Sequence, residues 1–263
     1  MNFFNTKLIS LSLVSAGGFL IFAVQNRLAG YALLLIALLL SLLVSKRMAQ
    51  DVAALVSGIL IVSIVPINTE ISWSHMSIMA AALAGAIILP YCLSKYYYKQ
   101  HSIEFPFGFR EPWGKSKWTY LLLVGLVGFL ILPFYMINSG VYQNWPATNE
   151  LSSITRLFIG TNALGIWDEL FFICTAFTIF RKYVSFWSAN ILQAVIFTSF
   201  LYELGFESYG PILIFIFALT QGYIFKITHS LYYLLCVHLL FDFILFWVLI
   251  HAHNPGVLSI FFY

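Results

Sequence analysis

The chain has 263 residues, of which 61% are hydrophobic and only 9% are charged, with a formal net charge of +3. A soluble domain carries about a quarter charged residues, so this composition excludes a water-exposed globular protein and indicates that lipid surrounds most of the chain. So small an excess of basic residues gives no reason to expect a nucleic-acid partner. Cys92, Cys174 and Cys236 lie in apolar runs without paired spacing, which favours packing over disulfides or a zinc ribbon.

Nine apolar segments follow one another along the chain, and a helix that crosses a bilayer needs about 20 such residues. We therefore predict an all-α, polytopic transmembrane bundle of about eight to nine spans. The first segment is longer than the apolar part of a signal peptide and has no cleavage site, so we interpret it as a retained span. The third is short and ends at Pro66. The segments are Leu8–Val24, Ala29–Ser45, Ala53–Ile67, Met76–Ser94, Thr119–Tyr142, Leu157–Phe180, Val184–Glu203, Tyr209–Ile227 and Ser230–His251.

Basic residues lie mostly on one side of a nine-span arrangement, and the other side carries only Arg27 and Arg156. Because cytoplasmic loops are enriched in lysine and arginine, this bias predicts a cytoplasmic N-terminus and an external C-terminus. The compact loops favour a bacterial plasma membrane. The residues on the basic side are Lys7, Lys46, Arg47, Lys95, Lys99, Arg110, Lys115, Lys117, Arg181, Lys182 and Lys226.

A polar loop at 95–118 divides the chain into two parts. We expect residues 1–94 to form a four-span accessory bundle, and residues 119–263 to form a core that contains almost all of the interior polarity. The loop itself is expected to be cytoplasmic. Aromatic and charged residues alternate in it from Glu104 to Arg110, which suits either contact with the inner leaflet or an ordinary loop with aromatic anchors.

Four ionisable residues lie deep within the predicted spans of the core. Asp168 and Glu169 are adjacent in the sixth span, and His238 and Asp242 share one face of the ninth. A charged side chain at mid-bilayer costs at least about 2.5–3.5 kcal/mol, so such residues usually face the bundle interior and serve a site. Counted from the basic side, Asp168 lies ~20 Å deep, Asp242 ~18 Å and His238 ~12 Å, so we expect the two spans to converge there.

This residue set is compatible with several kinds of chemistry. Histidine and carboxylates are zinc ligands that leave a position open for water. Two adjacent carboxylates also produce a base that can take a proton from water. Alternatively, an interior histidine can be a structural hydrogen-bonding residue, and an interior aspartate can hold helices together.

Three sequence stretches carry a family resemblance: DELFFI at 168–173, HLLFD at 238–242 and a glycine-containing stretch at 218–231. Over about 157–250 the chain resembles the CPBP family of intramembrane endopeptidases, which contains the CAAX prenyl proteases and bacteriocin-processing proteins. The family's motifs are EExxxR, FxxxH and HxxxN or HxxxD. The resemblance implies hydrolysis of peptide bonds near the membrane, with Asp168 or Glu169 activating water, His238 as general acid, general base or ligand, and Asp242 orienting His238 or assisting the oxyanion.

The chain departs from these motifs at two positions. Ile173 stands where the family has arginine, and ELGF at 203–206 matches the family's HLGF, which would place Glu203 at the middle histidine and Ser199 at the phenylalanine. The resemblance then implies one divalent metal, with zinc as the expected ion, held by Asp168, Glu203 and His238. Glu203 is, however, ~29 Å from the start of its span, so a water-facing position at the external end is an equal alternative.

We therefore predict an intramembrane endopeptidase whose partners are the lipid bilayer and a membrane-associated peptide or protein substrate. Two alternatives belong to other functional classes. Loss of the arginine and the middle histidine would suit an inactive protein of the same fold that acts as a scaffold, regulator or immunity protein. Intramembrane carboxylates beside a histidine would also suit a proton-coupled transporter.

Overall fold

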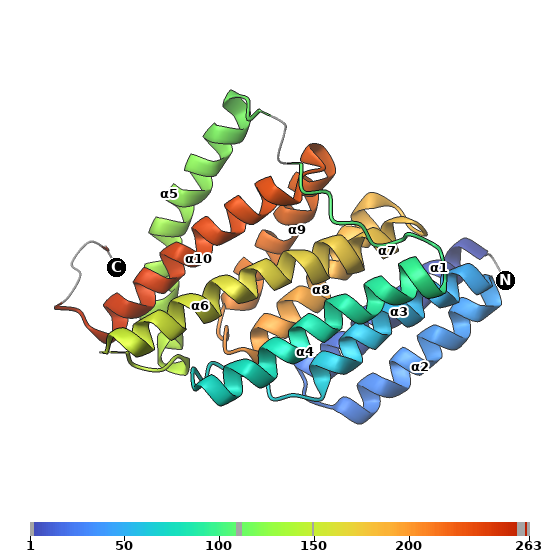
Figure 1. Ribbon diagram of the computed structural model, residues 1–263, viewed down its shortest axis with the longest axis horizontal. Helices are drawn as coiled ribbons and strands as arrows, with labels where there is room; N and C mark the ends of the chain where they lie inside the picture. The colour runs from blue at the N-terminus through green and yellow to red at the C-terminus, as the bar shows by residue number, and fades with distance from the viewer. Residues whose placement is uncertain (1–2, 109–111, 149, 257–260, 262–263) are drawn as a thin grey trace.

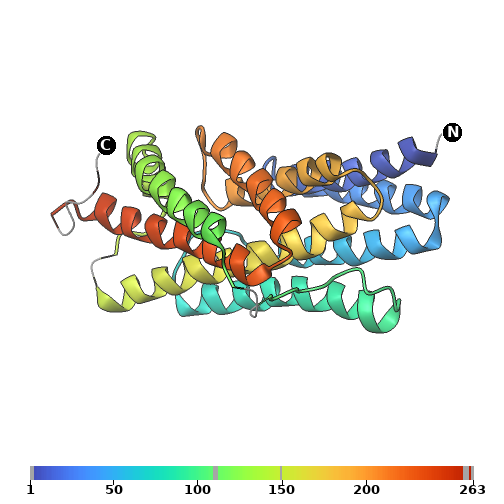
Figure 2. The same cartoon turned by 90° about the horizontal axis from the view of Figure 1, so that it is seen from above.

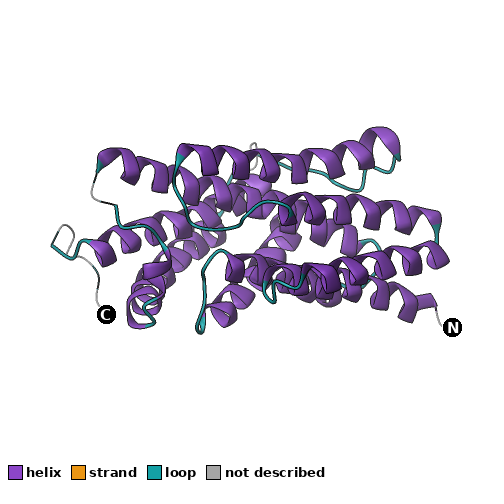
Figure 3. Ribbon diagram, turned by 90° about the horizontal axis from the view of Figure 1, so that it is seen from below, coloured by secondary structure: helices purple, strands orange, loops and turns teal. Residues whose placement is uncertain are grey.

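The computed structural model describes residues 3–108, 112–148, 150–256 and 261, and all regular structure in these ranges is helical (Figure 3). Nine long helices, some with short irregular extensions, make up the described chain. Their bounds are α1 (Phe3–Phe22), α2 (Arg27–Val44), α3 (Lys46–Ser63), α4 (Trp73–Cys92) with η1 (Leu93–Tyr97), α5 (Lys115–Asn138), the continuous α6 (Leu151–Asp168), η3 (Glu169–Phe177) and α7 (Thr178–Arg181), α8 (Phe186–Glu203), α9 (Gly210–Thr228) and α10 (Leu231–His253), with the short η2 (Val141–Asn144) after α5.

Each of the nine predicted spans corresponds to one of these helices, so the prediction of an all-α membrane bundle is confirmed. Seven helices are long and apolar enough to cross a membrane by length and composition. The other two are α3, which carries Lys46, Arg47 and Asp51, and α8, which carries several polar residues. Large apolar side chains such as Leu28 and Leu122 are more than 70% exposed, as expected for helices whose outer faces contact lipid. The chain is an integral membrane protein.

Short polar side chains fix where several helices begin. An N-cap side chain accepts a hydrogen bond from one of the first free backbone N–H groups, which have no partner within the helix. In a bundle of nearly uniform hydrophobicity, these caps set the helix boundaries that apolar periodicity leaves undefined. The capping residues are Asn26, Ser45, Ser72, Ser185 and Ser230.

The loops gather at two ends of the bundle, because the helices cross it in alternating directions. α1 begins at one end and α10 finishes at the other (Figure 1). The end that contains η1 and the described loop residues 98–108, 182–185 and 229–230 is called here the basic end. Loops 64–72, 139–148 and 204–209 form the opposite end, where Thr69 hydrogen-bonds the Asn144 carbonyl and Asn144 Nδ2 donates to the Gly205 carbonyl at 2.8 Å.

The basic residues of the described loops therefore lie together, as the nine-span count requires, although which side of the membrane they face stays a prediction. Arg110 falls outside the described residues. The predicted division at 95–118 also stays a prediction. The first helices nevertheless pack directly on the later ones, since Ser15 Oγ in α1 donates to the Leu192 carbonyl of α8 at 2.9 Å.

A buried carboxylate at the basic end ties three parts of the chain together. Asp51, only 2% exposed, pairs with Lys182 and accepts hydrogen bonds from Ser102 Oγ and the Tyr183 hydroxyl, both at 2.5 Å. Burial, together with the hydrogen bond to Asp51, raises the pKa of the Tyr183 hydroxyl well above its ordinary value, so that this group stays protonated and donates. The loop that carries Ser102 is thereby fixed against α3 and the α7–α8 turn.

Removal of the cation from this network is expected to destabilise the protein. In Lys182→Met the Asp51 carboxylate stays buried without its counter-ion, which costs up to about 3 kcal/mol because breaking a buried pair leaves an uncompensated charge. Thermal unfolding in detergent measures this effect against Lys46→Met, which removes an exposed lysine from the same end. Equal unfolding temperatures for the two variants would contradict the role assigned to the network, and Asp51→Asn in the Lys182→Met background is expected to restore part of the loss.

Candidate active site

The four ionisable side chains that the sequence singled out lie together in the middle of the bundle. The continuous helix α6–η3–α7 crosses the centre of the molecule, with α4 on one side and α10 on the other (Figures 1 and 2). It supplies Asp168 and Glu169, and α10 supplies His238 and Asp242. All four residues are less than 9% exposed, so the lipid around the bundle does not reach them.

His238 is the centre of this cluster, and each of its two ring nitrogens lies near a carboxylate. Nδ1 lies 2.6 Å from Glu169 Oε1, which is a short hydrogen bond. Nε2 lies 3.8 Å from Asp168 Oδ2 and 3.7 Å from Asp242 Oδ1. With a carboxylate as its partner, Nδ1 carries a proton and donates it to Glu169, which fixes the ring orientation and directs Nε2 toward the two aspartates.

A glutamine on α9 completes the surroundings of Glu169. Gln221 Nε2 donates to Glu169 Oε1 at 2.7 Å. Its helix is in turn bound to α8, because Asn190 Nδ2 donates to the Leu219 carbonyl at 2.8 Å and Gln193 Nε2 donates to the Ala218 carbonyl at 2.9 Å. Gln221 was not predicted to be a site residue, although an uncharged polar side chain inside an otherwise apolar helix is a signal that could have identified it.

A stretch of π-helix begins at the second residue of the acidic pair. From Glu169 to Phe177 the backbone is π-helical, a geometry often found at functional sites. Asp168 is the last α-helical residue before it, and adjacent helical residues point in different directions. As a result Asp168 lines a cavity, while Glu169 is directed at His238 and Gln221. Two neighbouring carboxylates are thus given different surroundings.

Gly165 is a further residue that sequence reasoning missed. A Cβ atom at this position would lie 1.8 Å from Asp242 Oδ2 and 3.1 Å from His238 Cδ2. Only a glycine lets α10 approach α6 closely enough to bring His238 and Asp242 beside Asp168. Its position three residues before the acidic pair, on the same helix face, is the signal that could have identified it.

We expect Gly165→Ala to disrupt the cluster and lower the unfolding temperature in detergent, since overpacking of this kind costs typically about 1–3 kcal/mol. Gly160→Ala is a matched control on the same helix, because its Cβ would meet only Met76 Cε at 3.8 Å. Alanine is favoured over glycine in a helix by about 1 kcal/mol, so this control should be neutral or stabilising. If both variants unfold at the same temperature, Gly165 is not required for the close approach.

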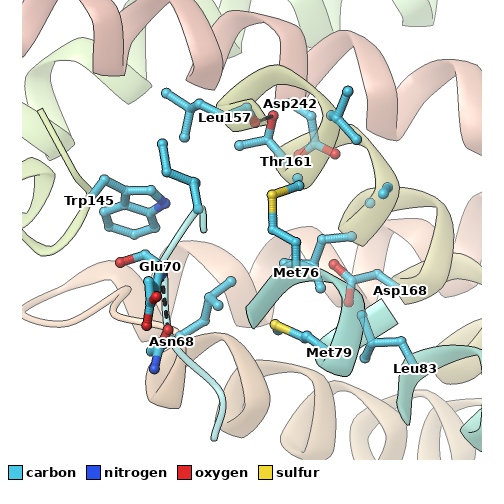
Figure 4. Close-up of a pocket in the computed structure, with 18 of the residues that line it drawn as sticks. Asn68, Glu70, Met76, Met79, Leu83, Trp145, Leu157, Thr161, Asp168 and Asp242 are labelled. Atoms are coloured by element: carbon cyan, nitrogen blue, oxygen red, sulfur yellow. Dashed lines mark hydrogen bonds between the residues drawn. The ribbon is translucent and has the colours of Figure 1, made fainter. Parts of the chain in front are cut away.

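A cavity of about 200 Å³ reaches the cluster from the opposite end of the bundle. Its walls come mainly from α4 and α6, and Asp168, His238 and Asp242 lie on its inner surface. Figure 4 shows Asp168 and Asp242 on one side of this space, with Met76 and Met79 of α4 between them and the loop residues at the mouth. Three polar side chains therefore face a space that a substrate can occupy.

Glu203, by contrast, is not brought to the cluster. It ends α8 at the opposite end of the bundle, within electrostatic range of Arg27, and it does not line the cavity. Leu201 does line the cavity, and Phe197, four residues earlier, lies with its ring 6.2 Å from that of His238. The family's FxxxH motif can therefore also be aligned with residues 197–201. In this second alignment frame, Phe197 takes the phenylalanine position and Leu201 takes the position of the middle histidine.

A metal held by Asp168, Glu203 and His238 was predicted, and the geometry does not assemble that set. The cluster has suitable donor types, and the buried atoms Asp168 Oδ1 and Asp242 Oδ2 accept no hydrogen bond from the described protein. Among the described residues, however, no group of three or more His, Cys, Asp and Glu side chains is arranged to hold an ion. The metal stays a prediction.

The metal content of the purified protein tests this prediction directly. If a divalent ion is bound by the cluster, His238→Ala should abolish it, whereas Glu203→Gln should leave it unchanged because Glu203 lies elsewhere. Elemental analysis of the wild type and both variants measures the outcome. Loss of the ion in Glu203→Gln would restore Glu203 as a ligand, and no ion in the wild type would show that the metal prediction is wrong.

Comparison with known protein families gives one match, and it coincides with this geometry. Residues 150–244 match the family model of type II CAAX prenyl endopeptidase Rce1-like proteins. The matched range contains all four clustered residues, and it confirms the CPBP resemblance over this part of the chain. Neither the search of curated proteins nor that of solved structures found a match.

The matched range thus spans the continuous α6–η3–α7, α8, α9 and the part of α10 that carries His238 and Asp242. Its arginine position is Ile173, only 1% exposed in the apolar core. In this chain the donors to Glu169 are instead His238 and Gln221. The carboxylate therefore has hydrogen-bond partners without the arginine.

Proposed function

We propose that the chain is an intramembrane endopeptidase that hydrolyses peptide bonds of membrane-associated substrates. The observation that supports this proposal most is the placement of Asp168 and His238 Nε2 together on the inner wall of a cavity, with Glu169 holding the far side of the imidazole. A base and a proton donor that meet at a substrate-sized space are the minimum that peptide hydrolysis requires.

In this proposal Asp168 is the base that activates water. The 3.8 Å between Asp168 Oδ2 and His238 Nε2 is too long for a direct hydrogen bond, and a water molecule can bridge groups at such separations. The water oxygen attacks the substrate carbonyl carbon while its proton passes to Asp168. Asp168 Oδ1 has no other hydrogen-bond partner in the described protein and is free to interact with the same water.

His238 and Glu169 complete the reaction. As an imidazolium, protonated on both ring nitrogens, His238 donates its Nε2 proton to the leaving amide nitrogen as the C–N bond breaks, and the proton held by Asp168 then passes to Nε2 for the next cycle. Glu169 is a positioning residue, because it contacts Nδ1 and does not line the cavity. Asp242 Oδ1, at 3.7 Å from Nε2, restricts the imidazole from the other side.

A second candidate, an inactive protein of the same fold that binds a membrane partner, is favoured by two buried apolar residues. Ile173 and Leu201 stand where the family motifs have arginine and, in the second frame, histidine. Proton-coupled transport is not favoured by any particular contact in the described residues. The two leading candidates differ in whether peptide bonds are cleaved at all.

Cleavage of membrane-reconstituted peptide substrates, detected by mass spectrometry, decides between them. Asp168→Asn and His238→Ala should each reduce the rate by about 10²-fold or more, the usual contribution of a general base or acid. Glu169→Gln should reduce it less, because a glutamine can still accept from Nδ1. Glu207→Gln, an exposed acidic residue of the same region, is the matched control and should retain full activity.

Two outcomes would contradict the proposal. If no peptide bond is cleaved by the folded wild-type protein across a broad set of membrane peptides, the binding function is favoured. If cleavage occurs but survives Asp168→Asn and His238→Ala unchanged, the activity does not arise from this cluster.

A further inference from the structure

The cavity beside the cluster extends toward only one end of the bundle. Its lining continues from Asp168 and His238 past Met79 and Leu157 to the loop residue Glu70. Figure 4 shows Glu70, Asn68 and Trp145 together at the side farthest from the aspartates. These loop residues belong to the opposite end, away from the basic residues.

A second, open depression continues the cavity outward. It is lined by Gln143, Asn144 and Pro146 and shares Asn68, Thr69, Glu70 and Trp145 with the cavity. The contact of Thr69 with the Asn144 carbonyl joins the two loops that border it. The cluster therefore communicates with the surface at this end through a polar mouth.

Toward the basic end the path is filled. The ring of Phe217 packs at 5.0 Å against the imidazole of His238, and Phe177, beyond the cluster, contacts Phe186 and Phe225 at 5.9 and 6.5 Å. At the surface, the backbone N–H of Leu231 donates to the Pro106 carbonyl at 2.7 Å and so holds a loop across the start of α10.

Carboxylates outnumber basic groups along the cavity, whose lining also includes His75 and His238. Glu70 is at the mouth and Asp168 and Asp242 are at the inner end, and the lining includes no lysine or arginine. Arg156 directly precedes the lining residue Leu157 in the sequence. Its guanidinium nevertheless lies outside the cavity lining, 5.9 Å from the centre of the Trp73 ring. Between the two ends the walls are mostly apolar. A terminal carboxylate would be repelled at both ends, whereas an amine would be attracted.

We propose that this cavity admits, from the end opposite the basic residues, an apolar peptide segment with a free amino terminus and not a segment with a free carboxyl terminus. The peptide nature of the occupant rests on the proposed endopeptidase function. The direction of access and the preference for positive charge rest on the cavity alone. Under the positive-inside rule this end is the external one.

Cysteine accessibility measures the direction of access without any need for catalysis. In a background with Cys92→Ala and Cys236→Ala, which retains the buried Cys174, Met79→Cys places a thiol in the cavity and Lys46→Cys places one at the basic end. Membrane-impermeant methanethiosulfonate reagents, one cationic and one anionic, are applied to right-side-out and to inverted vesicles. Ile78→Cys is the matched control, since Ile78 lies beside Met79, is 57% exposed and does not line the cavity.

Met79→Cys should react from the membrane face opposite to that of Lys46→Cys, and Ile78→Cys should not react from either face. The ratio of cationic to anionic labelling should be roughly tenfold higher at Met79→Cys than at Lys46→Cys, because carboxylates line the route. Glu70→Gln should lower that ratio. Three outcomes would overturn the proposal. Met79→Cys could react from the same face as Lys46→Cys, it could react no faster than Ile78→Cys, or it could be labelled faster by the anionic reagent than by the cationic one.

Protection from labelling tests the occupant. A short apolar peptide amide with a free amino terminus should slow the labelling of Met79→Cys several-fold more than the N-acetylated free acid of the same sequence. Equal protection, or stronger protection by the acid, overturns the preference for an amino terminus. Charge-selective labelling from the expected face, together with an absence of peptide cleavage, would refute the proposed enzyme activity while this route of access stands.

Discussion

The contact between Glu169 and His238 is the constraint on which the centre of this bundle depends. A carboxylate that is 1% exposed within a membrane protein is too costly to leave without a partner. Its two hydrogen-bond donors come from α10 and α9, at 2.6 and 2.7 Å. Three helices must therefore meet at one point. Apolar surfaces alone do not specify such a meeting, because lipid tails are as apolar as the side chains they would replace.

The same contact separates the roles of two neighbouring acidic residues. Glu169 Oε1 accepts from donors on α9 and α10, and Glu169 therefore serves the structure and the orientation of the imidazole, although its Oε2 has no partner among the described residues. Asp168 is left to face the cavity, with His238 Nε2 3.8 Å from its Oδ2. The buried Ile173 becomes understandable in this arrangement, because Gln221 provides a neutral donor where the family motif provides a cation, and a neutral amide is cheaper to bury.

The sequence was sufficient to predict the helices and the convergence of the acidic residues with His238. Charged side chains within membrane spans must face the bundle interior, and residues spaced i,i+4 share one helix face. The sequence was insufficient to predict where Glu203 lies relative to the cluster. The local match to HLGF favoured that residue, but α8 continues to its end and places Leu201, two residues earlier, at the cavity. Gly165 and Gln221 were also missed. Their importance lies in the distance between helices and in contacts across helices, which no pattern within a single span contains.

The two halves of the bundle differ in how firmly they are filled, and this difference accounts for the position of the cavity. Toward the basic end, aromatic rings pack behind His238, and the Asp51 network fixes the loops. Toward the opposite end, the wall of α4 presents Met76 and Met79 to the cavity. Methionine is flexible and polarisable and adapts to apolar surfaces of different shape. A filled half that holds the cluster, joined to a half with a methionine-lined wall, would suit the proposed endopeptidase, because apolar segments of different shape could be accommodated without displacing the cluster.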